Sequence, residues 1–476
     1  MIKVVIEQAA RLGRGAGWAK RGYLYNSCSK DTTMANKSDI LVLGATGFTG
    51  RLITRYLSAH PQRPKFTLAI GARSPSKLQK LVQDLSLPSS VKLVQVDVTR
   101  EEEVEVAVRG ARVVINTVGP YWLWGTPVVR SCVRNGAHYV DLTAEVAWLR
   151  NIIIEFDYFA TKTGSIIVPG CGFDSVPSDI SAYLANKTLK SATATNGVYP
   201  GLGDSTTAFR FRGGVSGGTI SSMMTLLEKV PPNALRESRE PYILSPFVGQ
   251  RRPLLRFLYN LPIPGTKPLK GAIFLMAAGN KAVIQRTFGL LEMQARDSKA
   301  KDAQLARYGP EFCYDEFMGT SGTMSALVFT AALIFSFGML MVRYVAKKLL
   351  PQSGEGPSDE KMEKGWFNAT NISTSATSPP VKVKSVIKGH GDGGYLLTAI
   401  MISESALCFL LPPVSESASI KSGSNDNVHT LSAIARQGGI LTPMSAFGDQ
   451  LIQRLEETGR FEFSSSIIDD AHKKDV

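Results

Sequence analysis

A glycine-rich turn between an apolar run and a helical segment constrains the fold of this chain more than any other feature. Ile40–Leu43 predicts a short strand that is buried on both faces, and residues 51–57 predict an amphipathic helix. The turn between them consists of Gly44, Ala45, Thr46, Gly47, Phe48, Thr49 and Gly50. Glycines at these positions allow a tight turn, a close approach of the backbone to a ligand, and packing of the helix on the strand. Because a helix N-terminus favours an anion, the turn predicts a pyrophosphate site for a dinucleotide.

The chain beyond the turn repeats the alternation of strand and helix. Further apolar runs lie at 66–70, 91–96, 113–118, 139–142 and 165–168, and helical stretches such as 76–85 and 101–109 fit between them. Alternating strands and helices predict a Rossmann-type, doubly wound parallel sheet. The expected fold class is therefore α/β, with a second α+β domain and a hydrophobic membrane-contacting helix described below.

The residues after the turn favour NADP over NAD. NAD sites usually place an acidic residue about 20 residues past the glycines, to bind the ribose hydroxyls. The segment 51–83 has no Asp or Glu, and the second strand ends instead at Arg73 and Ser74, with Lys77 just beyond. An arginine there can pair with a 2′-phosphate. The alternative is that Arg73 and Lys77 only begin a solvated helix.

Other candidate site residues lie where later strands end, because ligands of parallel sheets bind at the carboxyl ends of the strands. Asp97 could reach the adenine edge, and Asn116, Val118 and Gly119 would line the nicotinamide side. Tyr121 is the best candidate for a catalytic side chain on the substrate side. Asp174 and Ser175, in the loop after the sixth strand, could cap a helix or position the substrate.

Metal and disulfide chemistry receive little support. The five cysteines are scattered, and neither the cysteines nor the five histidines show ligand spacing, so we expect no metal site. The formal net charge of +14 suggests a negatively charged partner, such as a phosphate cofactor or anionic lipid.

A hydrophobic segment predicts membrane contact. Residues 317–342 contain no charged side chain, and Arg343, Lys347 and Lys348 follow. The alternative is a buried core helix. Residues 241–291 carry seven basic and no acidic residues with aromatic residues between them, which favours a lipid bilayer or lipid-droplet surface and disfavours nucleic acid. Because we expect the chain on both sides to form one fold, we expect the segment to enter and leave the membrane on one face.

The expected domain boundaries follow from these patterns. We expect a basic, disordered leader at 1–38, the NADP-binding domain at 39–170, an α+β substrate domain at 171–316, the hydrophobic segment at 317–348 and a flexible linker at 349–380. The α+β domain then continues over 381–430, and 431–476 returns to the first domain and ends in a tail. The leader holds seven basic and two acidic residues, which leaves a mitochondrial presequence open.

The sequence resembles the saccharopine dehydrogenase-like oxidoreductase family, which includes mycobacterial trans-acting enoyl reductases and a lipid-droplet protein of animals. The resemblance rests on the glycine turn and on the segments 116–121, 139–145, 169–179, 354–358, 365–367 and 438–443. It implies a Rossmann domain, a second α+β domain and a pyridine-nucleotide oxidoreductase whose substrate is mostly unassigned.

Three functions remain open at this point. The leading hypothesis is a membrane-associated NADP(H)-dependent oxidoreductase with an apolar, lipidic substrate, at a lipid droplet or the endoplasmic reticulum with its catalytic face toward the cytosol. The second is a non-catalytic lipid-droplet or membrane scaffold that retains the nucleotide-binding fold. The third is an amino-acid dehydrogenase, disfavoured because no cluster of arginines for several carboxylates appears outside the apolar-basic stretch at 241–291. A homodimer also stays open.

Overall fold

The structure is a computed structural model, and it describes residues 37–193, 199–214, 217–251, 256–341, 356–415 and 427–468. The predicted leader at 1–38 lies almost entirely outside the described residues. Residues 37–476 form one compact unit of contacts. Two seven-stranded sheets, each covered by helices, make up the described part of this unit.

The first sheet is parallel throughout and confirms the Rossmann-type α/β fold. Its strand order is β13-β6-β5-β4-β1-β2-β3. The strands are β1 (Ser38–Leu43), β2 (Leu68–Ala72), β3 (Lys92–Gln95), β4 (Ala111–Asn116), β5 (His138–Asp141), β6 (Ile166–Val168) and β13 (Gly439–Ile440). All six residues of β1 are buried, which explains its continuous apolar run in the middle of the sheet.

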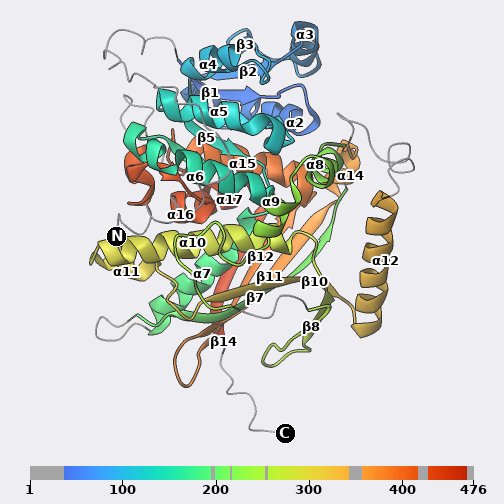
Figure 1. The fold of residues 1–476 in the computed structure, drawn as a ribbon, viewed down its shortest axis with the longest axis vertical. Coiled ribbons are helices and arrows are strands. Elements are labelled where there is room, and N and C mark those ends of the chain that lie inside the picture. The colour runs from blue at the N-terminus through green and yellow to red at the C-terminus, as the bar shows by residue number, and fades with distance from the viewer. Residues whose placement is uncertain are drawn as a thin grey trace. The chain divides into compact units, whose positions relative to one another are not determined.

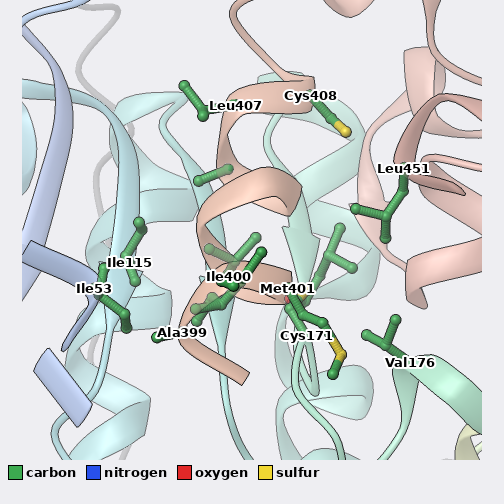
Figure 2. Packing of buried hydrophobic residues seen from close by; sticks show 14 of the residues in the cluster. Ile53, Ile115, Cys171, Val176, Ala399, Ile400, Met401, Leu407, Cys408 and Leu451 are labelled. Atoms are coloured by element: carbon green, nitrogen blue, oxygen red, sulfur yellow. The ribbon is translucent and has the colours of Figure 1, made fainter. Parts of the chain in front are cut away.

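Helices cover both faces of this sheet, as Figure 1 shows. They are α2 (Phe48–Ser58), α3 (Pro75–Asp84), α4 (Glu101–Arg109), α5 (Tyr121–Asn135), α6 (Val146–Thr163) and α15 (Thr398–Cys408). The helices α16 (Pro443–Ala446) and α17 (Asp449–Glu457) pack against each other, and α17 also packs against α15. The fully buried α15 comes from the last quarter of the chain and packs against α2, β4 and β5. Figure 2 shows its Ile400 and Met401 between Ile115 on one side and Val176 on the other. The Rossmann half is therefore completed by distant sequence.

The second sheet is mixed, with strand order β14-β12-β11-β7-β10-β9-β8. Only β7 and β10 pair in parallel. Its strands are β7 (Leu202–Arg212), β8 (Leu258–Leu261), β9 (Leu269–Ala272), β10 (Cys313–Thr320), β11 (Trp366–Ser375), β12 (Lys382–His390) and β14 (Phe461–Ile468). The helices α7 (Val176–Thr193) and α10 (Ala277–Asp297) pack on the sheet. The remaining helices are α8 (Gly217–Glu228), α9 (Pro232–Glu237), α11 (Lys301–Ala306), α12 (Thr323–Met341) and α14 (Asp359–Glu363), with short η elements at Arg63–Lys65, Gly393–Leu397, Val428–Thr430 and Ala435–Gln437.

The predicted flexible linker at 349–380 is wrong over most of its described part. Residues 359–363 form α14, and residues 366–375 form β11, which pairs with β7 and β12 inside the second sheet. The Gly, Pro, Ser and Thr content suggested a linker, but several of the Ser, Thr and Asn side chains in β11 are partners in a buried ladder. Asn371 donates to Ser205 and Thr207 at 2.9 Å each, and Ser373 donates to Ser205 at 2.9 Å. Composition alone therefore misled the prediction.

The two C-terminal segments also divide differently from the expected domains. In the predicted α+β continuation at 381–430, β12 joins the second sheet but α15 packs on the Rossmann half. In the predicted return at 431–476, β13 joins the Rossmann sheet while β14 adds an edge strand to the second sheet. The chain thus crosses between the two sheets twice after residue 381.

The hydrophobic segment begins later than expected as a helix. Residues 317–320 end strand β10, and α12 starts only at Thr323. In the described part of the chain, no helix has both the length and the apolar character needed to span a bilayer. The predicted membrane-contacting helix is therefore not part of the established fold class.

Candidate functional site

The glycine turn has the backbone geometry of a phosphate cradle. Gly44 has a φ of +81°, and a Cβ there would lie 2.7 Å from Thr117 Oγ1. A Cβ on Gly50 would lie 2.2 Å from the carbonyl oxygen of Gly44, so only glycine lets α2 come so close to the turn. Gly47 is exposed, and a Cβ there would lie 3.2 Å from the same oxygen. The turn therefore requires glycine at positions 44 and 50, while Gly47 leaves the space above the helix N-terminus open.

The N-terminus of α2 is free to receive an anion. Gly47 is its N-cap and supplies no side chain, and the first turn has no acidic residue. Its own amide donates to Gly44 O at 2.9 Å, which holds the turn closed beneath the helix. The remaining first-turn N–H groups and the helix dipole fit a pyrophosphate without any side-chain competitor. Ala45 is buried in the core, while Thr46, Phe48 and Thr49 are partly exposed around this end.

The adenine side of the site is exposed and basic. Arg73 and Lys77 are both exposed, and Ser74 caps α3 by accepting from the Lys77 amide at 3.4 Å. Asp97 accepts from the amide and hydroxyl of Thr99, and these hydrogen bonds, with a smaller attraction from Arg73, lower its pKa. The structure therefore brings Arg73 and Asp97 together across the ends of β2 and β3. Their contacts with adenosine and its 2′-phosphate stay predictions.

The nicotinamide side is built from buried polar groups that bond to one another. Asn116 is fully buried, its Oδ1 accepts from Val118 N at 3.0 Å, and its Nδ2 donates to Tyr139 at 3.1 Å. Tyr139 in turn donates to Asp141 at 2.8 Å, and Asp141 also accepts from the amides of Thr143 and Gly170 at 2.9 Å each. This chain of bonds fixes the ends of β4, β5 and β6 relative to one another. Asn116 thus shapes the Val118–Gly119 turn from below.

Burial dominates the electrostatics of this network. It raises the pKa of Asp141 to about 7, against the lowering effect of the hydrogen bonds from Thr143, Gly170 and Tyr139. The same burial raises the pKa of the Tyr139 phenol well above its ordinary value. Proton release from either group is therefore less favourable than from an exposed side chain of the same type.

Tyr121 lies at the start of α5, but its hydroxyl is already engaged. The side chain is 6% exposed, and its hydroxyl donates to Asn116 O at 2.9 Å and accepts from Leu142 N at 3.2 Å. Burial raises its pKa well above the ordinary value for a phenol. These contacts give the hydroxyl a clear part in joining the ends of β4 and β5. Its catalytic role stays a prediction.

Glu145 is a site residue that the sequence reasoning did not single out. Its carboxylate accepts from the amides of Tyr121 at 2.9 Å and Trp122 at 2.7 Å, and so caps the N-terminus of α5. Burial raises its pKa, while these bonds and one from Ser222 lower it. Ser222 belongs to α8, and its Oγ lies 3.6 Å from where a Cβ on Gly119 would stand. Helix α8, which follows β7 of the second sheet, therefore lies close to the Gly119 turn.

The sequence signal for Tyr139, Asp141 and Glu145 lay in the segment Tyr139–Glu145, which supported the family resemblance but had no roles assigned to its residues.

Cys171, in the neighbouring loop, is fully buried and donates to Val168 O at 3.2 Å. Figure 2 shows it among the apolar residues around α15. Across the described ranges, no group of three or more His, Cys, Asp or Glu side chains could hold a metal ion.

Comparisons with known proteins agree with this geometry. Residues 40–168 match the family model described as the saccharopine dehydrogenase NADP-binding domain. The first sheet and its glycine cradle are therefore an NADP-binding domain, and the residues around α2 fit that cofactor.

Curated relatives match nearly the whole chain. A Mycobacterium tuberculosis protein provisionally named a trans-acting enoyl reductase is 30% identical over 449 residues, which cover 90% of this chain and 97% of the relative. The trans-acting enoyl reductase of Mycobacterium ulcerans is 28% identical, over 88% of this chain and 96% of its own. The yeast saccharopine dehydrogenase (L-Glu forming) aligns in structure over 91% of this chain and all of its own, with 10% identity and a TM-score of 0.48. On the strength of the full-length relatives, the chain belongs to the saccharopine dehydrogenase-like family of NADP-binding oxidoreductases, which is related to the trans-acting enoyl reductases.

Proposed function

We propose that the protein is an NADPH-dependent reductase of a lipidic acyl substrate, and that it works at a membrane or lipid-droplet surface. The observation that carries the proposal is the free N-terminus of α2 above the glycine cradle, with a fixed network at the nicotinamide end. Such a site holds a cofactor in one orientation, which is the protein's share of hydride-transfer chemistry. Relatives with the name enoyl reductase support a conjugated acyl thioester as the substrate class.

The side chains that face this end of the sheet from the second domain favour an apolar substrate. Phe173, in the loop after β6, packs edge-on against Phe209 and Phe211 of β7 at centroid distances of 6.1 and 5.6 Å. Phe211 is 37% exposed, so part of this aromatic surface is open. The buried Arg286 is occupied by Ile440 O, Leu244 O and Asp157. Arg286 is therefore not available to bind a substrate carboxylate, as an amino-acid dehydrogenase would require of its arginines.

When bound, NADPH supplies the hydride. The chain's own residues would hold the cofactor and orient the substrate. The amides at the N-terminus of α2 would bind the pyrophosphate, and the Asn116–Tyr139–Asp141 network fixes the loops at the expected nicotinamide end. The aromatic residues of β7 and the loop after β6 exclude water from the apolar part of the substrate.

The lipid surface would be met by α12 and the β8–β9 hairpin, which contact each other. Large apolar side chains are exposed along α12, including Met324 at 73%, Val328 at 65% and Phe335 at 70%. Exposed Arg256, Lys267 and Lys270 lie in or next to the hairpin. An apolar helix face beside cations suits a surface of anionic lipid. We propose a lipid-droplet or endoplasmic-reticulum surface, with the NADP site on the cytosolic side.

Turnover tests the reductase directly. Purified protein with trans-2-hexadecenoyl-CoA should oxidise NADPH, measured as loss of absorbance at 340 nm, and form hexadecanoyl-CoA in equal amount. Protein that binds NADPH but leaves a panel of enoyl and ketoacyl thioesters unchanged would favour the non-catalytic scaffold.

Vesicle flotation tests the membrane surface. The protein should float with vesicles of phosphatidylcholine and phosphatidylserine, and the double variant Val328→Glu, Phe335→Glu should lose most of this binding. The control Ile154→Glu changes a residue of α6 that is also 69% exposed and should float like the wild type. Equal flotation of all three proteins would show that the exposed face of α12 does not bind the membrane.

A further inference from the structure

Within the described residues, one carboxyl group in the loop after β6 has no bonding partner, and this loop follows the carboxyl end of a strand, where the nicotinamide is expected. Asp174 lies in the loop between β6 and α7 and is partly buried. No hydrogen bond or ion pair joins its side chain to any other residue in the described part of the chain. Burial without a protein partner disfavours the charged form of a carboxyl group, so this position is a candidate for a functional role.

The other carboxyl groups around this region are all bonded. Asp141 and Glu145 accept from backbone amides after β5 and β4, and Glu316 of β10 accepts from Ser178, Tyr314 and Asn280. Asp179, in α7, accepts from the Thr287 hydroxyl and the Met444 amide. Asp392, just before the η element at 393–397, accepts from the amides of Gly214 and Tyr395. Asp174 is therefore the exception among the carboxyl groups on the elements packed around it.

The loop that carries Asp174 is held by its other residues. The Gly170 amide donates to the Asp141 carboxylate at 2.9 Å, and the Cys171 amide donates to Asp141 O at 2.8 Å. The Phe173 amide donates to Thr398 at 3.0 Å, and the Ser175 amide donates to Gly172 O at 3.1 Å. These bonds tie the loop to the end of β5 and to α15. The Asp174 side chain has no part in holding the loop in place.

We propose that Asp174 is the proton donor of the reduction, a role that rests on the proposed function. Hydride from NADPH adds to the β-carbon of the enoyl thioester, and the electrons of the carbon–carbon double bond move onto the thioester oxygen to give an enolate. The enolate α-carbon then takes the proton from the Asp174 carboxyl, whose O–H bond breaks. The resulting carboxylate is reprotonated by water, so one NADPH and one proton are consumed for each double bond.

The surroundings of Asp174 suit this task. Burial alone raises its pKa to about 6, and no neighbouring charge contributes. At pH 7 about a tenth of the molecules then carry the proton, whereas an ordinary aspartate would carry almost none. Because the carboxyl group is not fully enclosed, water can restore the proton after each turnover.

The decisive experiment compares Asp174→Asn with Asp174→Glu and with the exposed control Asp297→Asn. The substrate is trans-2-hexadecenoyl-CoA, and NADPH binding is followed by its fluorescence. For Asp174→Asn we expect kcat to fall at least about 100-fold with an unchanged Kd for NADPH, and Asp174→Glu to recover part of the rate. In the wild type, kcat should decline as the pH rises above about 6.

A measurement without substrate separates this role from a structural one. The pKa of Asp174 is higher in the folded chain than in the unfolded chain, so the wild type loses stability as the pH rises from about 4 to about 6. Asp174→Asn should therefore have the higher Tm at pH 8, and the gap should close toward pH 4. A variant that is active with the wild-type pH profile, or less stable at every pH, would overturn the role of Asp174. Failure of the wild type itself to reduce the thioester would overturn the proposed function and this step with it.

Discussion

The two ends of the NADP site are built in different ways. At the adenine end, Arg73 and Lys77 are exposed side chains on the loop and helix after β2, and they face solvent. At the nicotinamide end, Asn116, Tyr139 and Asp141 are fully buried and bond to one another beneath the loops. The exposed end can recognise the cofactor at little cost to stability. The buried end holds the geometry on which hydride transfer depends, and changes there should cost stability first.

The phosphate cradle lies between these two ends, and its disruption should have the largest effect. Gly47→Ala places a methyl group above the first turn of α2, where the pyrophosphate would lie. We expect NADPH affinity to fall about 100-fold, or about 2.7 kcal/mol, in fluorescence titrations. Gly110→Ala is the control, because Gly110 caps α4 at a φ of −81° and a Cβ there meets its nearest atom at 3.4 Å. Equal affinities for the two variants would remove the cradle from the binding site.

Tyr121→Phe tests the buried end. The change leaves Asn116 O and Leu142 N without their hydroxyl partner, and we expect it to lower the free energy of unfolding by about 1–3 kcal/mol. Denaturant unfolding measures this, with Tyr158→Phe as control, since Tyr158 is 66% exposed on α6. Unchanged stability together with a loss of more than about 100-fold in kcat would establish the catalytic role instead.

Arg73→Ala tests the exposed end. We expect about a tenfold loss of NADPH affinity, no change for NADH and an unchanged Tm, because the arginine would pair only with the 2′-phosphate. The exposed Lys80, later in α3, provides the matched control as Lys80→Ala. An equal loss of affinity for NADPH and NADH would mean that Arg73 does not bind the 2′-phosphate.

Ser222→Ala should have the smallest effect, and it tests the contact between α8 and the Glu145 carboxylate. It removes one of several bonds to the Glu145 carboxylate, so we expect a loss of about 0.5–1 kcal/mol in stability and faster amide exchange at Tyr121 and Trp122. Ser221→Ala, at the exposed neighbouring position, should change neither. Identical amide exchange in the two variants would show that Ser222 of α8 does not stabilise the Glu145 cap.

The sequence predicted the parts of the site that depend on neighbouring residues. The cradle from Gly44 to Gly50 and the strands of the first sheet follow from local pattern, since a strand, turn and helix form within about 20 residues. Long-range partners could not be read in this way. The Glu145 cap joins positions 24 residues apart, and β11 finds its partners in β7 more than 160 residues away. The Ser and Thr residues of β11 have the composition of a linker, and their buried partners cannot be recognised from the sequence.

The central claim is that the N-terminus of α2 binds the cofactor and that the adenine end selects its 2′-phosphate. Isothermal titration calorimetry of the purified protein with NADPH and with NADH tests this most directly. We predict one NADPH bound per chain, at least about tenfold more tightly than NADH. Equal affinity for the two cofactors, or no heat of binding with either, would contradict the account.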